Sequence, residues 1–338
     1  MGDFILDTGP GIANKMLRKG LGENKNFLFS DAKSKLTRVL EIIYKTIYSD
    51  CVCFCSSSKA NIIAIKVAKL FKKKTVYIMH GYLSHEYKIN NTEVDEEELK
   101  EIKEYEQYIF QNVTKVFCVS KKLMQYMKTA EPQFAEKFDY NFNGVDFQKI
   151  EDIARMYNRK RNQKQILSIG GGMRRKNNLT VCKAIDKLNK EKNLNLKFVV
   201  VGLPYSDKDK IESYDFVTYY ESLPYEKVLE LMSESAIYVQ NSSFETFGLS
   251  VLESLISGCD LLISNNVGAV DTITTITKDD LIFNTYEEQE IADKIEHLLK
   301  SHNAERLKQG INKEEILYTN SAKNLVNKIE ELFYKNNH

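Results

Sequence analysis

Residues 241–262 read NSSFETFGLSVLESLISGCDLL, and they lie at the centre of the pattern that decides the fold. The apolar run 236–240 before them predicts a strand, and residues 248–257 have the spacing of a helix. Gly258 ends that helix, and residues 261–264 predict a second strand. A strand, a helix and a strand in this order predict one βαβ unit of a parallel sheet.

Two carboxylates lie eight positions apart in this stretch. Glu245 falls in the loop after the first strand, and Glu253 falls inside the helix. The helix begins near Phe247 and Gly248, so its free N–H groups and the positive end of its dipole favour a phosphate group. Gly248 lets a ligand approach the backbone closely. Glu253 can accept hydrogen bonds from two neighbouring sugar hydroxyls, as acidic residues do for ribose.

A second motif lies upstream, where residues 168–178 read SIGGGMRRKNN. A predicted strand ends in three glycines, which allow a ligand close to the backbone, and three cations follow. Guanidinium and ammonium groups neutralise a diphosphate leaving group. The stretch therefore predicts a diphosphate site that uses Lys176 with either Arg174 or Arg175.

Predicted strands and helices alternate along the whole chain. Two series of similar size predict two doubly wound α/β domains, at residues 1–150 and 151–320, with a closing helix at 321–338 that either crosses back to the first domain or makes a dimer contact. Ligands of such sheets bind at the carboxyl ends of the strands, and with two domains the natural site is the cleft between them. The predicted strands are 3–7, 51–55, 75–79, 115–119 and 139–142, then 166–169, 197–201, 217–219, 236–240 and 261–264.

The composition is that of a globular protein. Of the 338 residues 43% are hydrophobic and 28% charged, which excludes a disordered chain, and the formal net charge of +1 does not indicate a nucleic-acid partner. The charge is uneven, since residues 1–80 hold 14 Lys and Arg against 6 Asp and Glu, and residues 81–149 hold 9 against 13. The basic first part suits either an anionic membrane surface or an ordinary solvated surface.

The sequence has no apolar run long enough to predict a transmembrane helix, and its first residues do not resemble a secretion signal. Six cysteines without metal-ligand spacing indicate reduced thiols. We expect a cytoplasmic protein that can associate with the inner face of the cell membrane.

The pair of glutamates, the helix of small and apolar residues and the following GCDLLIS together resemble the retaining GT-B glycosyltransferases, in particular family 4, the glycosyl transferases group 1 type. The resemblance spans nearly the whole chain and is weaker in the first half. It implies two Rossmann-like domains facing a cleft. It also implies transfer of a hexose-type sugar from a nucleotide-sugar, with UDP-sugars favoured, to a saccharide or lipid-linked saccharide with retention of configuration. The basic first part suits an enzyme that works on a lipid-linked sugar, and a capsule, exopolysaccharide or lipopolysaccharide pathway would fit. We expect no cofactor and no metal, because the cationic loop and the helix end would supply the charge stabilisation that a metal gives elsewhere.

The resemblance also implies roles for single residues. Glu253 would hold the ribose, Lys176 the diphosphate, and Glu245 the hydroxyls of the donor sugar. His80, at the end of strand 75–79, would contact the donor from the other domain. In the family the glycine loop reads G-R-L-x-x-x-K; Lys176 matches its lysine, but its arginine falls on Gly171. Further donor-side residues are Gly172, Gly202, Leu223, Thr246, Phe247, Gly248 and Leu249, and weaker acceptor-side residues are Gly9, Gly11, Tyr82, His85 and Glu86.

Other interpretations have weaker support. The missing arginine favours a non-catalytic GT-B-like subunit that stabilises a partner enzyme. A sugar-nucleotide epimerase is not expected to carry the glutamate pair in this setting. A nicotinamide-dependent oxidoreductase would need a third glycine where Asn14 stands. The acidic pair Asp207 and Asp209 is interpreted as a solvated turn and not as a metal site.

Overall fold

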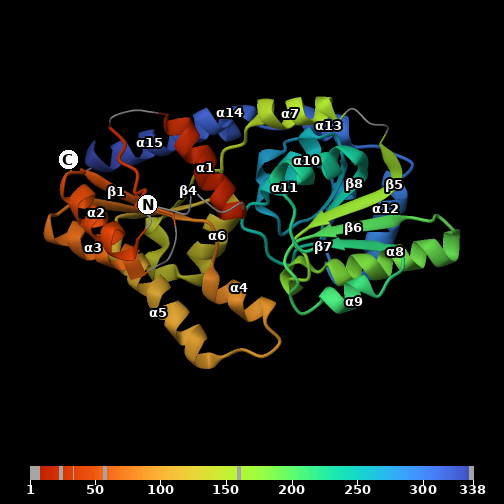
Figure 1. Ribbon diagram of the computed structural model, residues 1–338, viewed down its shortest axis with the longest axis horizontal. Coiled ribbons are helices and arrows are strands. Elements are labelled where there is room, and N and C mark those ends of the chain that lie inside the picture. Colours follow the sequence, from red (N-terminus) through yellow and green to blue (C-terminus); the bar gives the residue numbers. More distant parts are fainter. Residues whose placement is uncertain (1–7, 23–25, 33, 56–58, 158–160, 335–338) are drawn as a thin grey trace. The chain divides into compact units, whose positions relative to one another are not determined.

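The computed structural model describes residues 8–22, 26–32, 34–55, 59–157 and 161–334 (Figure 1). Contacts divide the chain into two compact units. The first comprises Met1–His85, Val94–Gly144 and Glu314–His338, and the second comprises Glu86–Glu93 and Val145–Lys313. Each unit is an α/β layer structure around its own parallel sheet.

The sheet of the first unit has the strand order β1-β2-β3-β4, and every neighbouring pair is parallel. Its central strands are apolar on both faces because helices cover a parallel sheet on both sides. These strands confirm four of the five predicted in the first half of the chain; the fifth, 3–7, lies outside the described residues. The bounds are β1 Cys51–Phe54, β2 Lys74–Met79, β3 Lys115–Cys118 and β4 Phe138–Tyr140.

Most helices of this unit begin at a capping side chain. Ser34, Asp95 and Ser120 each accept a hydrogen bond from a backbone N–H of the first turn, which satisfies a donor that the helix itself leaves unpaired. The helices are α1 Gly9–Leu21, α2 Lys35–Ile47, α3 Lys59–Leu70, α5 Glu96–Asn112, α6 Lys121–Ala130 and α15 Tyr318–Tyr334, with α4 Leu83–Asn90 bridging into the second unit.

The start of α1 corrects one prediction. Gly9 and Gly11 were expected in a loop, but they form the first turn of this helix. Thr8 accepts a hydrogen bond from the Gly11 N–H at 3.2 Å. Pro10 fits the first turn because the N–H that it lacks would have no partner there.

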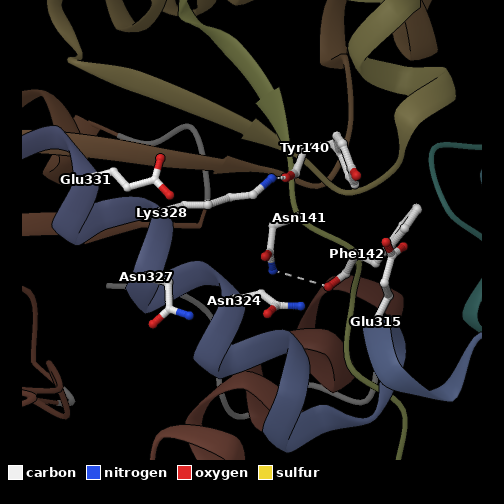
Figure 2. Close-up of a pocket in the computed structure, with 8 residues that line it drawn as sticks. All are labelled: Tyr140, Asn141, Phe142, Glu315, Asn324, Asn327, Lys328 and Glu331. Carbon is white, nitrogen blue, oxygen red and sulfur yellow. Dashed lines mark hydrogen bonds between the residues drawn. The ribbon is translucent and has the colours of Figure 1, made fainter. Parts of the chain in front are cut away.

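The closing helix α15 packs against α1 and β4 within the first unit. Ser321 Oγ donates to the Phe142 carbonyl at 2.5 Å, and Lys328 bonds the Tyr140 carbonyl. Figure 2 shows the contact of Lys328 with Tyr140 beside a pocket of about 270 Å³ between β4 and α15. Its lining residues are Tyr140, Asn141, Phe142, Glu315, Asn324, Asn327, Lys328 and Glu331.

The sheet of the second unit is also fully parallel, with the order β10-β9-β8-β5-β6-β7. The chain starts in the middle at β5, builds outward through β6 and β7, and then returns to the other side of β5 with β8. The order therefore reverses between β5 and β8. The bounds are β5 Asn162–Ile169, β6 Lys197–Val201, β7 Val217–Tyr220, β8 Ser235–Gln240, β9 Asp260–Ser264 and β10 Leu281–Ile282.

Helices lie on both faces of this sheet (Figure 1). The residues of β8 are all buried, and α8 and α12 pack together over a core rich in Val, Ile and Leu. Asp207, expected in a solvated turn, precedes the short helix α9. The helices are α7 Phe147–Met156, α8 Asn178–Lys192, α9 Lys208–Glu212, α10 Tyr225–Glu234, α11 Leu249–Ile256, α12 Glu288–Leu298, α13 Ala304–Gln309 and α14 Lys313–Ile316, whose last three residues belong to the first unit.

None of the helices in the described ranges combines the length and the apolar character that crossing a membrane requires.

The contact between α15 and the end of β4 generates a stability prediction. A Cβ on Gly144 would lie 2.6 Å from the Tyr318 Cα, whereas a Cβ on Gly9 would meet no atom within 4 Å. Gly144→Ala should therefore lower the free energy of unfolding by about 1–3 kcal/mol, the usual cost of overpacking. Gly9→Ala, the control, should leave it nearly unchanged. Thermal unfolding measures both, and equal melting temperatures for the two variants would contradict the packing described.

Candidate active site

The loop after β5 is shaped by glycines. Gly171 has φ +58° and Gly202, at the end of β6, has φ +143°. A Cβ on Gly171 would collide with the backbone of Gly202 and Leu203. The family's arginine position is therefore one where this chain has no room for a side chain, and the cations of the loop lie further along it.

Those cations form a short 3₁₀ turn, Arg174–Lys176. Arg174 is exposed, and its Nη1 donates to the Asn91 carbonyl at 3.3 Å. Arg175 and Lys176 turn the other way, toward Glu245 in the loop after β8. Of the two arginines left open by the sequence, Arg175 is the one that the structure brings beside Lys176.

Four charged side chains meet at this point. The Lys176 ammonium contacts the Glu245 carboxylate, and Arg175 Nη1 lies 3.5 Å from the same oxygen. The other nitrogen, Arg175 Nη2, lies 3.4 Å from a carboxylate oxygen of Glu86. All four side chains are between 10% and 17% exposed. Arg175 Nε is buried and has no hydrogen-bond partner among the described residues. Glu86 was expected on the acceptor side; its contact is with this cationic turn.

Burial and charge act in opposite directions on these groups. Burial alone would raise the pKa of Glu245, but the charges of Lys176 and Arg175 outweigh it and lower that pKa. Burial lowers the pKa of Lys176 although Glu245 opposes the shift. Glu245 is therefore an anion at neutral pH and is neutralised by its two neighbours.

A buried polar network behind Glu245 was not anticipated from the sequence. Gln240 Nε2 donates to the Glu245 carboxylate at 3.3 Å. The Tyr238 hydroxyl donates to Gln240 Oε1 at 2.5 Å and lies 2.7 Å from Ser250 Oγ on α11. The only local signal is a glutamine and a tyrosine inside a strand that is otherwise apolar. The network fixes the side-chain orientation of Glu245.

Glu253 lies on α11 and is also buried, at 6% exposure. It accepts a hydrogen bond from the Tyr225 hydroxyl at 2.8 Å, and Lys149 Nζ lies 4.9 Å from the centroid of the Tyr225 ring. Burial raises the pKa of Glu253 to about 7, although the Tyr225 hydrogen bond and the Lys149 charge oppose the shift. Tyr225, the first residue of α10, is the partner that the sequence did not reveal.

The start of α11 is held by the loop after β9. Gly248 has φ +92°, and its backbone faces the Val267 side chain and Glu245. The Gly268 N–H donates to the Glu245 carbonyl at 3.0 Å, and the Ala269 N–H donates to the Phe247 carbonyl at 2.7 Å. Thr246, Phe247 and Gly248 are buried, and Leu249 is half-buried.

The loops after β5 and β8 therefore lie side by side at the reversal of strand order. In open parallel sheets this switch point, outside the carboxyl ends of the strands, is where nucleotides bind. Both sequence motifs fall on these two loops. Gly172 is buried in the first loop, and Gly202 and the half-buried Leu223 follow the neighbouring strands β6 and β7.

Besides Gly9 and Gly11, the first unit holds three predicted side chains, and each of these has a partner there. The role assigned to each of them stays a prediction. His80 Nε2 is 3.0 Å from Asn14 Oδ1, the Tyr82 hydroxyl donates to Glu131 at 2.7 Å, and His85 Nδ1 is 3.2 Å from the Tyr126 hydroxyl. Among the residues the structure describes, no three His, Cys, Asp or Glu side chains are grouped so that they could hold a metal ion.

Comparisons with known proteins identify a family domain and the fold. Residues 149–316 match the family model described as glycosyl transferases group 1. No curated protein sequence matches the chain.

Solved structures with the same fold include a sucrose-phosphate synthase from Thermosynechococcus elongatus, with a TM-score of 0.69 and 15% identity over 97% of this chain and 94% of that one. HepE from Anabaena in complex with UDP has a TM-score of 0.65 and 14% identity over 87% of this chain and 82% of that one. An α,α-trehalose-phosphate synthase (UDP-forming) from Burkholderia xenovorans has a TM-score of 0.66 and 9% identity over 88% of this chain and 79% of that one. The chain therefore carries a glycosyl transferases group 1 domain at residues 149–316 and is a glycosyltransferase of the GT-B fold.

Proposed function

We propose that the second unit binds a UDP-sugar and that the sugar is transferred to a hydroxyl of a saccharide or lipid-linked saccharide. The observation that carries the proposal is that a pair of cations in the loop after β5 and a buried carboxylate on α11 belong to the same site. The cations are Arg175 and Lys176, and the carboxylate is Glu253. A nucleoside diphosphate needs both a cationic partner and a partner for its ribose. HepE, solved with UDP and with UDP-glucose, supports uridine as the base.

Each residue then has a role set by its surroundings. Glu253 accepts hydrogen bonds from the ribose hydroxyls in place of Tyr225, or together with it. Arg175 and Lys176 stabilise the departing diphosphate together with the N-terminus of α11. The residue before this helix is Gly248, so no side chain caps the free N–H groups of its first turn. Glu245 accepts hydrogen bonds from hydroxyls of the donor sugar. His80 is proposed to contact the donor.

Retention of configuration is part of the proposal. Glu245 is neutralised by two cations, so it is poorly suited to attack the anomeric carbon as a free nucleophile. A front-face reaction does not need one. The bond between the anomeric carbon and the phosphate oxygen breaks, the acceptor oxygen bonds to the same face, and the acceptor proton passes to the leaving phosphate.

An exposed apolar face on α2 supports a lipid-linked acceptor. Leu36, Leu40, Tyr44 and Tyr48 follow one another at four-residue spacing and are 74%, 60%, 61% and 69% exposed. The opposite side of α2 buries Ile42. A helix that is apolar on both sides needs a second surface that removes its exposed apolar side from water. Leucines and tyrosines in a basic region are typical of a surface that binds an anionic membrane. We therefore place the enzyme at such a membrane, in cell-surface polysaccharide synthesis.

The pKa of Glu253 predicts how donor affinity depends on pH. Its folded-state pKa is near 7, so the carboxylate that accepts hydrogen bonds from ribose is lost as pH falls through 7. UDP-glucose, whose own phosphates do not titrate in this range, should bind about tenfold more weakly at pH 6 than at pH 8. Glu253→Gln should bind weakly at both values and remove the dependence. Calorimetric titration measures this, and a wild-type affinity independent of pH would exclude Glu253 from the ribose site.

The membrane contact predicts a second measurement. The double variant Leu36→Asp, Leu40→Asp should bind phosphatidylglycerol vesicles at least about tenfold more weakly than wild type. It lacks two apolar side chains that the membrane would otherwise remove from water. Leu203→Asp is the matched control, since Leu203 is 53% exposed in the second unit. Vesicle co-sedimentation, with phosphatidylcholine vesicles as the uncharged reference, reports the binding. Equal binding by all three proteins would show that α2 is not the membrane-binding face.

A further inference from the structure

Glu253, the proposed ribose partner, is oriented by one hydrogen bond. Its side chain is 6% exposed, and the Tyr225 hydroxyl donates to its Oε1 at 2.8 Å. Among the described residues, Tyr225 is the one side chain that hydrogen-bonds this carboxylate. A glutamate side chain has several rotatable bonds, and ordering it on binding costs free energy. A contact that orders the side chain beforehand therefore favours binding.

Tyr225 is itself held between α7 and α11. It is the first residue of α10, and Lys149 Nζ from α7 lies 4.9 Å from the centroid of its ring. The same ammonium lies 3.4 Å from the carboxylate of Glu226, the next residue of α10. A cation over an aromatic face is attracted by the ring. The contacts therefore run from α7 through α10 to Glu253 on α11, all within the second unit.

The acidity of the two groups sets the direction of the hydrogen bond. Burial and the charge of Glu253 raise the pKa of Tyr225, so the hydroxyl keeps its proton and donates. Burial raises the pKa of Glu253 to about 7, and the bond from Tyr225 opposes this shift because it favours the charged carboxylate. Tyr225 therefore both orients the carboxylate and helps to keep it charged.

The carboxylate can accept hydrogen bonds from ribose while Tyr225 stays in place. A charged carboxylate has about four lone-pair positions that accept hydrogen bonds. Tyr225 occupies one of them, on Oε1. The two ribose hydroxyls need two more, so the acceptor capacity of Glu253 is sufficient for all three donors.

We propose that Tyr225 is a positioning residue of the donor site: it holds the Glu253 carboxylate in the orientation in which that carboxylate accepts the ribose hydroxyls, and it stays in place when the donor binds. Lys149 holds Tyr225 in turn. This inference rests on the proposed function of the same site, in which Glu253 binds ribose. It follows that the Tyr225 hydroxyl contributes to affinity only for ligands that carry the ribose hydroxyls.

The first test compares UDP with 2′,3′-dideoxy-UDP, which has the same base and diphosphate but neither ribose hydroxyl. At pH 7, Tyr225→Phe should bind UDP about fivefold more weakly than wild type and bind the dideoxy analogue within about twofold of wild type. Tyr219→Phe is the matched control, because it also loses one hydroxyl hydrogen bond, to the Leu203 carbonyl at 2.9 Å. It should match wild type with both ligands.

The second test follows the pH dependence of UDP-glucose binding, which a purely structural role of Tyr225 would not move. Tyr225→Phe removes a hydrogen bond that favours the charged form of Glu253, so the pKa of Glu253 rises further. The fall in affinity should be centred about one pH unit higher than in wild type. Tyr219→Phe should leave it where it is. Both variants keep the other charged or titratable groups that face the pair, which are Lys149 on α7, Asp146 at its start, Glu226 on α10, Tyr238 on β8 and Lys308 on α13.

Calorimetric titration separates the ways of failing. If wild type and Tyr225→Phe bind UDP equally, or the pH dependence does not move, the positioning role is wrong and the proposed donor site stands. An equal loss with UDP and with the dideoxy analogue would also contradict the role, since the effect would not pass through ribose. If wild type binds UDP and the dideoxy analogue equally well, Glu253 does not bind ribose and this inference is wrong with that assignment. If wild type does not bind UDP, the proposed function itself is wrong.

Discussion

The ion pairs of Glu245 with Lys176 and Arg175 are the interaction on which the site depends. They join the loop after β5 to the loop after β8, at the one place where the strand order of the second sheet reverses. A carboxylate this buried is tolerated only when it is paired, and removing one partner of such a pair costs about 3–5 kcal/mol. The same pairs keep two cations nearly buried between the two loops. Structural and chemical roles of these residues are therefore inseparable.

Glycine makes this arrangement possible. A Cβ on Gly170 would fall 2.5 Å from the Lys176 Cγ, so the lysine side chain can pass over the loop only because no side chain is there. Gly171 and Gly202 bring the ends of β5 and β6 close together. The loop has glycine at position 171, and the guanidinium that lies beside Lys176 and Glu245 belongs to Arg175, four residues later.

Local patterns predicted much of the fold. The strand, helix and strand from β8 to β9 and the strand β6 were found within a residue or two, because apolar runs bounded by glycine are strong signals. The pattern failed where signals are ambiguous. Gly9, Pro10 and Gly11 suit a loop and the first turn of a helix equally well, and the cap on Thr8 decides between them. The helix α7, Phe147–Met156, follows a turn signal and was not expected.

The site was predictable only in its central residues. Glu245, Glu253 and Lys176 come from motifs that are compact in sequence. Their partners do not, because Tyr225 reaches Glu253 across 28 residues and Glu86 reaches Arg175 across 89. The choice between Arg174 and Arg175 depends on the direction in which one turn faces, which spacing alone does not determine.

That choice can be tested directly, because we propose that Arg175 in the turn after β5 binds the diphosphate of a nucleotide-sugar. The measurement is the UDP affinity of Arg175→Ala beside that of Arg174→Ala, two neighbours in one turn. We expect Arg175→Ala to weaken UDP binding about tenfold or more, the loss of a charge-assisted hydrogen bond, and Arg174→Ala to stay within about twofold of wild type. Equal affinities for the two variants, or a larger loss with Arg174→Ala, would show that Arg175 does not bind the diphosphate.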